Sequence, residues 1–213
     1  MDQTTDGRRA QRRSQRQALS RNQLLDAAEE VFGRRGFYEA TLKDVAELAE
    51  FSVGSVYSFF DNKEDLYRSV FLRRGEEYLP AMKEAASDGA DAREQLGNLV
   101  RFEVEFFRRH PAFGRLYLRA ARGAALPAWE SPVDDILVAN FHRAMGIQAE
   151  IFRRGQRDGT LRRGEPEVLA RLLSGIIGAF HGVDPVLLGE DAPAGPGFDL
   201  EDLYQIVDRA FGA

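Results

Sequence analysis

A short run of small and hydroxyl side chains is the first place where this chain offers recognition chemistry. Ser52, Ser55 and Ser58 recur at intervals of three, with Val53 and Gly54 between them. Residues three apart share one face of a helix, so this face would be small and nearly uncharged, where an ordinary surface helix carries Lys and Glu. Short side chains with hydroxyls suit a helix that enters the major groove of DNA and reads base edges.

Two short helices joined by a tight turn are expected to position these residues. Thr41 and Asp44 have the spacing of a capping box, and apolar residues follow from Leu42 at i, i+3, i+4 and i+7. Ser52 can cap the second helix, whose apolar side is predicted to hold Val56, Tyr57 and Phe60. The stretch from Thr41 to Lys63 therefore predicts a helix-turn-helix. A surface helical hairpin with a polar face is the alternative.

The residues around this turn resemble the TetR family of bacterial regulators. That family carries a signature like A-G-V-S-x-G-x-[LIV]-Y-x-[HY]-F-x-[NS]-K-x-x-L, and this chain reads AEFSVGSVYSFFDNKEDL from Ala49 to Leu66. The resemblance extends back to about Leu24 and covers roughly the first third of the chain. Two departures matter: Glu50 replaces the usual turn glycine, and Phe59 replaces a His or Tyr that commonly touches phosphate in the family.

The resemblance implies a double-stranded DNA operator as a partner. Val53 is expected to meet a thymine methyl group and Ser55 a base edge, whereas Tyr57 and Lys63, which matches the family lysine, are expected to contact phosphate. The full set expected at the major groove or its rim is Thr41, Ser52, Val53, Gly54, Ser55, Tyr57, Ser58 and Lys63.

Composition limits the classes of protein that fit. With 213 residues, 44% hydrophobic and 30% charged, the chain has an ordinary soluble balance and room for one large or two small domains. It has no cysteine, which excludes disulfides, thiolate nucleophiles and Cys-based metal sites. There is no apolar N-terminal run of the signal-peptide type, and the most apolar stretch, Leu172 to Phe180, is too short to span a bilayer. We expect a cytoplasmic protein with no membrane partner.

The distribution of charge fits a DNA-binding head. The net charge is −5, yet residues 1–63 hold equal numbers of basic and acidic residues, and residues 1–21 hold six arginines against two aspartates. A neutral head with a basic arm, on an acidic body, suits a DNA reader. Residues 1–19 are poor in apolar side chains, so we expect them to be disordered in the free protein. They are either a solubilising tail or an arm that lies along phosphates or in a minor groove.

Helix start and stop signals predict an all-α fold with two parts. A first helix from Ser20 to about Gly36 would complete a three-helix DNA-binding head, residues 20–63, which contains the helix-turn-helix. A larger helical body for ligand binding and dimerisation would occupy residues 64–213. Further helices are predicted over residues 62–86, 91–110, from 111, 131–158, 166–182 and 200–211, with a Gly/Pro-rich loop at 189–197.

Small residues gather in the helix predicted from Pro166. Ser174, Gly175, Gly178 and Gly182 lie on adjacent turns, although a glycine inside a helix is less favourable than alanine by about 1 kcal/mol. Close approach of another helix would offset this. That helix either belongs to the same chain or, as the resemblance implies, to a homodimer in which the last two long helices form a four-helix interface. Leu203 of the final helix is expected in the same interface.

Polar residues interrupt the apolar faces of two body helices. Glu103 lies on one such face, and Asn140 and Gln148 on another. Each is explained by an edge position or a paired place in the core. Together with nearby aromatic residues and His142 they would line an apolar pocket with a few polar anchors, and TetR-like proteins bind inducers among these helices. The full candidate set is Phe102, Glu103, Phe106, Phe113, Tyr117, Trp129, Asn140, Phe141 and Gln148.

Three functions are compatible with these features. The best fit is a ligand-responsive, sequence-specific transcriptional regulator, a homodimeric repressor that a small-molecule effector releases from a palindromic operator. The alternative is a DNA-binding protein without such a ligand, acting structurally or through a protein partner. An enzyme fits worst, because the three histidines are far apart and no dinucleotide fingerprint, P-loop or nucleophile elbow is present. We expect no metal and no other cofactor.

Overall fold

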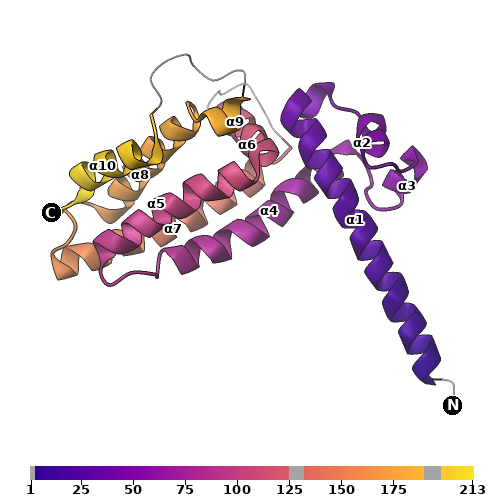
Figure 1. Ribbon diagram of the computed structural model, residues 1–213, viewed down its shortest axis with the longest axis horizontal. Coiled ribbons are helices and arrows are strands. Elements are labelled where there is room, and N and C mark those ends of the chain that lie inside the picture. Colours follow the sequence, from indigo (N-terminus) through magenta and orange to yellow (C-terminus); the bar gives the residue numbers. More distant parts are fainter. Residues whose placement is uncertain (1–2, 125–131, 190–197) are drawn as a thin grey trace. The chain divides into compact units, whose positions relative to one another are not determined.

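The chain folds into two helical units. The computed structural model describes residues 3–124, 132–189 and 198–213, and over these ranges every regular element is a helix, so the expected all-α fold is confirmed (Figure 1). The head comprises Met1–Val70 and the body Phe71–Ala213. The division falls inside a helix, later than the boundary after Lys63 that the sequence suggests. Within the described ranges, no helix is both long enough and apolar enough to cross a membrane.

The head is built from α1 (Gln3–Glu39), α2 (Leu42–Leu48), α3 (Val53–Tyr57) and the first turns of α4 (Lys63–Ala85). Helix α1 has an apolar face that packs against α2 and is buried, as are the inward residues of α2 and α3. The core residues of the head are Leu24, Leu25, Ala28, Val31, Phe32, Leu42, Val45, Ala46, Val56 and Phe60.

Two predicted helix caps, at Thr41 and Ser52, are confirmed in the head, and Asn62 provides a third. Thr41 Oγ1 accepts from the backbone N–H of Asp44 at 3.1 Å, and the Asp44 carboxylate accepts from the backbone N–H of Thr41 at 2.9 Å, which completes the capping box. Ser52 Oγ accepts from the N–H of Ser55 at 3.0 Å. The Asn62 side chain accepts from the N–H of Asp65 at 2.8 Å. Each cap satisfies a donor that the helix cannot satisfy itself.

The N-terminal arm differs from the expectation. Residues 3–19, expected to be disordered, continue α1, so the helix has no start at Ser20. Residues 11–19 are exposed. Low hydrophobicity means that this segment has no core to join, but Arg, Gln and Ala are strong helix formers and the segment extends a helix already nucleated by the head. Gly36 does interrupt α1, with a φ of 77°.

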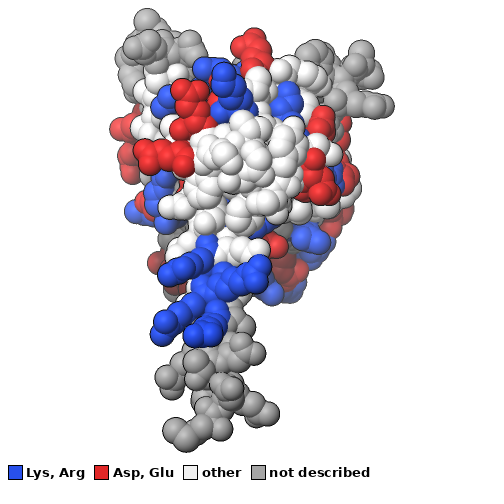
Figure 2. Space-filling model, turned by 90° about the vertical axis from the view of Figure 1, so that its right-hand side faces the viewer, with Lys and Arg blue, Asp and Glu red and all other residues white. Residues whose placement is uncertain are grey.

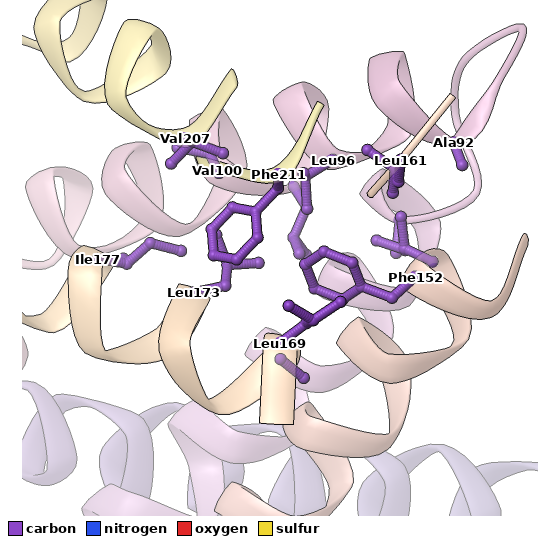
Figure 3. Packing of buried hydrophobic residues seen from close by; sticks show 14 of the residues in the cluster. Ala92, Leu96, Val100, Phe152, Leu161, Leu169, Leu173, Ile177, Val207 and Phe211 are labelled. Carbon is purple, nitrogen blue, oxygen red and sulfur yellow. The ribbon is translucent and has the colours of Figure 1, made fainter. Parts of the chain in front are cut away.

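The body contains the remainder of α4 with α5 (Ala92–Arg109), α6 (Pro111–Ala124), α7 (Asp134–Asp158), α8 (Pro166–His181), α9 (Pro185–Leu188) and α10 (Leu200–Phe211). Helix α7 begins at Asp134 rather than Ser131, and the four-residue α9 was not predicted. Side chains of α5, α7, α8 and α10 meet in the core shown in Figure 3. There the rings of Phe152 and Phe211 meet edge to face at 5.2 Å.

Candidate functional site

The outward face of α3 is short, polar and uncharged. Ser52, Val53, Gly54 and Ser58 are exposed, and Ser55 is half-buried. The hydroxyls are held in local hydrogen bonds: Ser52 Oγ lies 2.8 Å from Ser55 Oγ, and Ser58 Oγ donates to the carbonyl of Ser55 at 2.6 Å. Each hydroxyl group keeps further capacity either to donate or to accept. The face therefore presents fixed hydrogen-bonding groups with no charged side chain among them.

The side chains of Tyr57 and Lys63 have surroundings that the sequence analysis did not predict. Tyr57 is 57% exposed, so its assignment to the buried side of α3 with Val56 was wrong. This exposure leaves the phenol available to a phosphate. The ammonium of Lys63 donates to the carbonyls of Ala40 at 3.1 Å and Tyr38 at 3.4 Å, and it sits 4.5 Å from the centre of the Phe37 ring. In the free protein Lys63 thus ties α4 to the chain that follows α1, an arrangement which the sequence did not reveal.

The turn between α2 and α3 has an unusual residue at its tightest point. Glu50 has a φ of 59°, in the left-handed region where glycine is favoured. The chain therefore keeps the turn conformation that glycine serves in the family signature, at some conformational cost to Glu50. Glu50 in place of the family's glycine therefore leaves the conformation of the turn unchanged.

Arginines of α1 gather beside α3. Arg9, Arg12, Arg13, Arg16, Gln17, Ser20 and Phe59 line one shallow hollow on the head. Arg12, Arg13 and Arg16 are exposed, and Figure 2 shows basic side chains gathered on this side of the molecule, next to an uncharged surface. Phe59, which stands where the family has a phosphate-contacting residue, thus lies against a basic patch that other residues provide.

The body encloses a cavity of about 150 Å³ among α4, α5, α6, α7 and α8. Its wall is mainly aromatic and aliphatic, with a few polar side chains among them. The lining residues are Phe71, Arg74, Gly75, Tyr78, Glu103, Phe107, Phe113, Tyr117, Leu137, Asn140, Phe141, Ala144, Met145, Gln148, Ser174, Ile177, Gly178 and His181. An apolar cavity with a few convergent polar groups is the usual form of a small-molecule site.

A chain of hydrogen bonds crosses the cavity wall. The Gln148 amide donates to Glu103 Oε1 at 2.9 Å and accepts from Ser174 Oγ at 3.2 Å, while the Tyr78 hydroxyl donates to the same carboxyl group. Burial raises the pKa of Glu103 to about 7, and the bonds from Gln148 and Tyr78 oppose that rise. At neutral pH both the protonated and the ionised form of this buried carboxyl group are therefore populated.

His181 is a further cavity residue, and the sequence analysis missed it. Its side chain is 4% exposed, and burial lowers its pKa to about 4, so the imidazole is neutral at physiological pH. The last turn of a helix is an ordinary place for a histidine, and nothing in the local pattern marks this one. Only the packing of α8 against α5 places it beside Phe107, with the ring centroids 4.7 Å apart.

Six of the predicted ligand residues lie in the cavity wall: Glu103, Phe113, Tyr117, Asn140, Phe141 and Gln148. Phe102 and Phe106 do not line it and instead pack against Tyr78, with ring centroids 5.5 and 5.0 Å away. His142 is exposed, and Trp129 lies outside the described residues. Asn140 approaches the cavity over Gly75, where a Cβ atom would come within 2.7 Å of its amide nitrogen.

The residues predicted for the dimer interface divide into three kinds. Gly175 and Gly178 are exposed, with open space where a Cβ atom would stand, and Gly182 is half-buried. Ser174 instead turns inward to Gln148. Leu203 is 1% exposed and belongs to the core of its own chain, so it offers no surface to a partner; its inward position follows from the packing of α10 on α5 and α8.

Known proteins resemble this chain in sequence and fold. Residues 24–70 match the family model described as "Bacterial regulatory proteins, tetR family". The HTH-type transcriptional repressor NicS of Pseudomonas putida is 29% identical over 150 residues, 70% of this chain and 69% of that protein. A solved transcriptional regulator from Saccharomonospora viridis, in complex with choline, superposes with a TM-score of 0.76 at 20% identity over 92% of this chain and 99% of that one. AibR, solved with isovaleryl coenzyme A and operator DNA, gives a TM-score of 0.70 at 16% identity over 89% and 97%.

Proposed function

Because the chain belongs to the TetR family and is a DNA-binding transcriptional regulator rather than an enzyme, we propose that it is a homodimeric repressor which a small molecule releases from a palindromic operator. One observation carries this proposal. A single chain combines an exposed, hydroxyl-bearing helix in the head with a mainly apolar, polar-anchored cavity in the body. The first feature suits a base-reading surface and the second a small-molecule effector.

In this proposal α3 enters the major groove. Val53 meets a thymine methyl group and Ser55 a base edge, because these two side chains are short and lie on the outward side of the helix. Tyr57 contacts phosphate at the rim. Lys63 already donates to two carbonyls, so it adds positive potential and at most its remaining N–H to a phosphate.

The arginines of α1 extend the same surface. Arg12, Arg13 and Arg16 are exposed on a helix, and side chains of this kind contact phosphates without reading sequence. We therefore assign the arm a role in affinity and not in specificity, in preference to a solubilising tail. Replacing all three by Gln is expected to weaken binding to every duplex and to flatten its salt dependence. If the dependence of DNA affinity on salt concentration is unchanged, the segment is better explained as a solubilising tail.

Dimerisation is proposed through α8 and α10. Leu172 is 55% exposed and Ile206 43% exposed, and Gly175 leaves room for a helix to approach. The test compares Gly175→Leu with Gly146→Leu, because a Cβ atom also meets open space at Gly146 of α7. Sedimentation velocity should show a dimer for wild type and Gly146→Leu and a weakened dimer for Gly175→Leu. A wild-type monomer at micromolar concentration would contradict the proposal.

The effector is proposed to occupy the cavity of the body. Glu103 favours a cationic or hydroxyl-bearing ligand, and the aromatic wall suits either, since rings attract cations. The structural neighbour from Saccharomonospora viridis was solved in complex with choline, which is a cation. Helix α4 supplies Phe71, Gly75 and Tyr78 to the wall and runs back to Lys63 of the head. A ligand that prefers one position of α4 would shift the population that fits DNA.

The decisive experiment is selection of duplex DNA from a random pool with the full chain, followed by a screen for compounds that release the selected duplex. The expected result is a palindromic sequence, as two-fold symmetry requires, and at least one releasing compound whose affinity falls in Glu103→Gln or Asn140→Ala. No enriched sequence would contradict the operator. A broad screen in which no metabolite or drug releases the DNA would favour the regulator without a small-molecule ligand.

A further inference from the structure

His181 is a buried polar side chain of the cavity wall for which the described residues provide no hydrogen-bond partner. Neither Nδ1 nor Nε2 is bonded to any described residue, and both atoms are buried. Buried polar side chains in proteins nearly always have partners, so each exception calls for an explanation. The ring lies in the wall of the same cavity as Glu103, which makes an occupant of the cavity the natural partner.

The surroundings of His181 keep it neutral and hold it in place. Phe107 meets the imidazole edge to face, and burial is the main reason for its low pKa. Two charged groups act on it with opposite sign: Asp184 raises the pKa and Arg108 lowers it. These two are engaged with each other, Nε of Arg108 to Oδ2 of Asp184 at 2.8 Å. The ring therefore offers one N–H donor and one nitrogen acceptor.

Two other polar groups of the wall, Gln148 and Arg74, are already committed to protein partners. Gln148 is bonded to Glu103 and to Ser174, which fixes the orientation of its amide. The guanidinium of Arg74 pairs with Glu77 at 2.5 Å. A ligand gains less from groups that must first give up existing bonds. An incoming polar group therefore gains more at His181 than at Gln148 or Arg74.

Resting on the proposed ligand-responsive function, we propose that the effector is a single-ring apolar compound bearing a hydroxyl group, and that His181 binds this hydroxyl. The size follows from the cavity, because about 150 Å³ is the volume that admits benzene in an engineered core. The hydroxyl follows from the imidazole, since a hydroxyl both donates and accepts, as a neutral imidazole does. The aromatic wall contributed by Phe107, Phe113 and Tyr117 would enclose the ring.

Phenol and toluene are the matched probes, because they differ by a hydroxyl against a methyl group. Calorimetric titration of the full-length protein should give phenol at least about tenfold higher affinity than toluene, since a site built for a hydroxyl rejects the analogue that lacks it. The preference should disappear in His181→Phe and persist in Glu103→Gln. Among the three histidines, the imidazole ¹⁵N signals lost in His181→Phe should shift with phenol and not with toluene.

Three results would overturn the role of His181. They are equal affinity for the two probes, a preference that survives in His181→Phe, or no binding of either probe to wild type. A thermal melt serves as the control that His181→Phe is folded. His181→Gln keeps a donor and an acceptor, so it should retain part of the preference for phenol. DNA release is measured separately. Phenol that binds through His181 without weakening DNA binding supports this inference and contradicts the proposed induction.

Discussion

The two candidate sites of this protein hold their polar groups in opposite ways. On the head, the hydroxyls of α3 are exposed and bonded to neighbours three residues away, such as Ser52 to Ser55. In the body, Glu103 and Gln148 are buried and bonded across 45 positions of the chain. The difference predicts that substitutions on α3 change DNA binding with little change in stability, whereas substitutions around the cavity change stability and its pH dependence.

The largest effect is expected at the buried ion pair of the body. Asp184 is fully buried, pairs with Arg108 and accepts from the N–H of Val186 at 3.1 Å. Asp184→Ala leaves the guanidinium without its partner and should lower the free energy of unfolding by about 3 kcal/mol, measured by denaturant titration. Asp184→Asn keeps an acceptor for the N–H of Val186, so it should lose less stability than Asp184→Ala. A loss of stability below about 1 kcal/mol in Asp184→Ala would mean that this ion pair contributes no more than a solvent-exposed salt bridge.

Removing the charge of Glu103 should change how stability depends on pH. The pKa of Glu103 is about 7 in the folded chain against an ordinary value of 4.5. The folded state therefore binds more protons between these values, and the contribution of Glu103 to stability falls as pH rises through this window. The amide that replaces the carboxyl group in Glu103→Gln does not titrate. Relative to wild type, this variant should thus gain about 3 kcal/mol between pH 4.5 and pH 8.

Comparing the stability of wild type and Glu103→Gln as a function of pH separates the contribution of Glu103 from that of His181. The pKa of His181 is lowered, so its contribution is lost as pH falls from 6.5 through about 4, in both proteins alike. Tyr78 and Tyr117 face Glu103, but their raised pKa values keep them neutral in this range. Parallel pH profiles of wild type and Glu103→Gln would show that the carboxyl group is ionised or hydrated in the folded state.

A charge placed on α3 should act on DNA binding alone. Val53 is 37% exposed at the start of the helix, so Val53→Glu is tolerated by the fold but brings a negative charge to the phosphates. The affinity for the selected operator should fall about a hundredfold, with a melting temperature close to that of wild type. Leu48→Glu, at another exposed apolar position of the head, is the control. Equal losses in both variants would place the DNA elsewhere.

The smallest effect is expected at the capping box. Thr41→Ala removes the side-chain acceptor of the Asp44 N–H and should lower stability by about 1 kcal/mol. Thr41→Ser keeps the hydroxyl and should melt as wild type does. If Thr41 also touches DNA, the alanine variant should lose more operator affinity than its stability explains. An affinity unchanged in folded Thr41→Ala would limit Thr41 to capping.

Much of the head was readable from the sequence because its signals are local. The capping box at Thr41 and the cap at Ser52 each depend on residues within one turn of a helix, and both were confirmed. Tyr57 shows the limit of that reading. On a helix as short as α3, one residue decides between the buried and exposed sides, and the packing of Val56 and Phe60 settled it.

The cavity was predictable only in outline. Glu103, Asn140 and Gln148 stand out in the sequence as polar residues on apolar faces, and all three line the cavity. The sequence could not pair Glu103 with Gln148, exclude Phe102 and Phe106, or include His181, because these depend on how helices distant in the chain are rotated against one another. Leu203 failed as an interface residue for the same reason, since periodicity defines an apolar face but not its partner.

The sequence by itself determined the helices of the protein, most of their ends, the uncharged outward face of α3 and the resemblance to the TetR family. These features depend on hydrogen bonds and apolar spacings that span only a few residues, so they can be read from a short stretch of sequence. Tertiary structure alone decided where Lys63 donates, which groups surround the buried carboxyl of Glu103, and that His181 finds no hydrogen-bond partner among the described residues. Burial and neighbours set the charge and bonding of such groups, and both arise only when the helices pack.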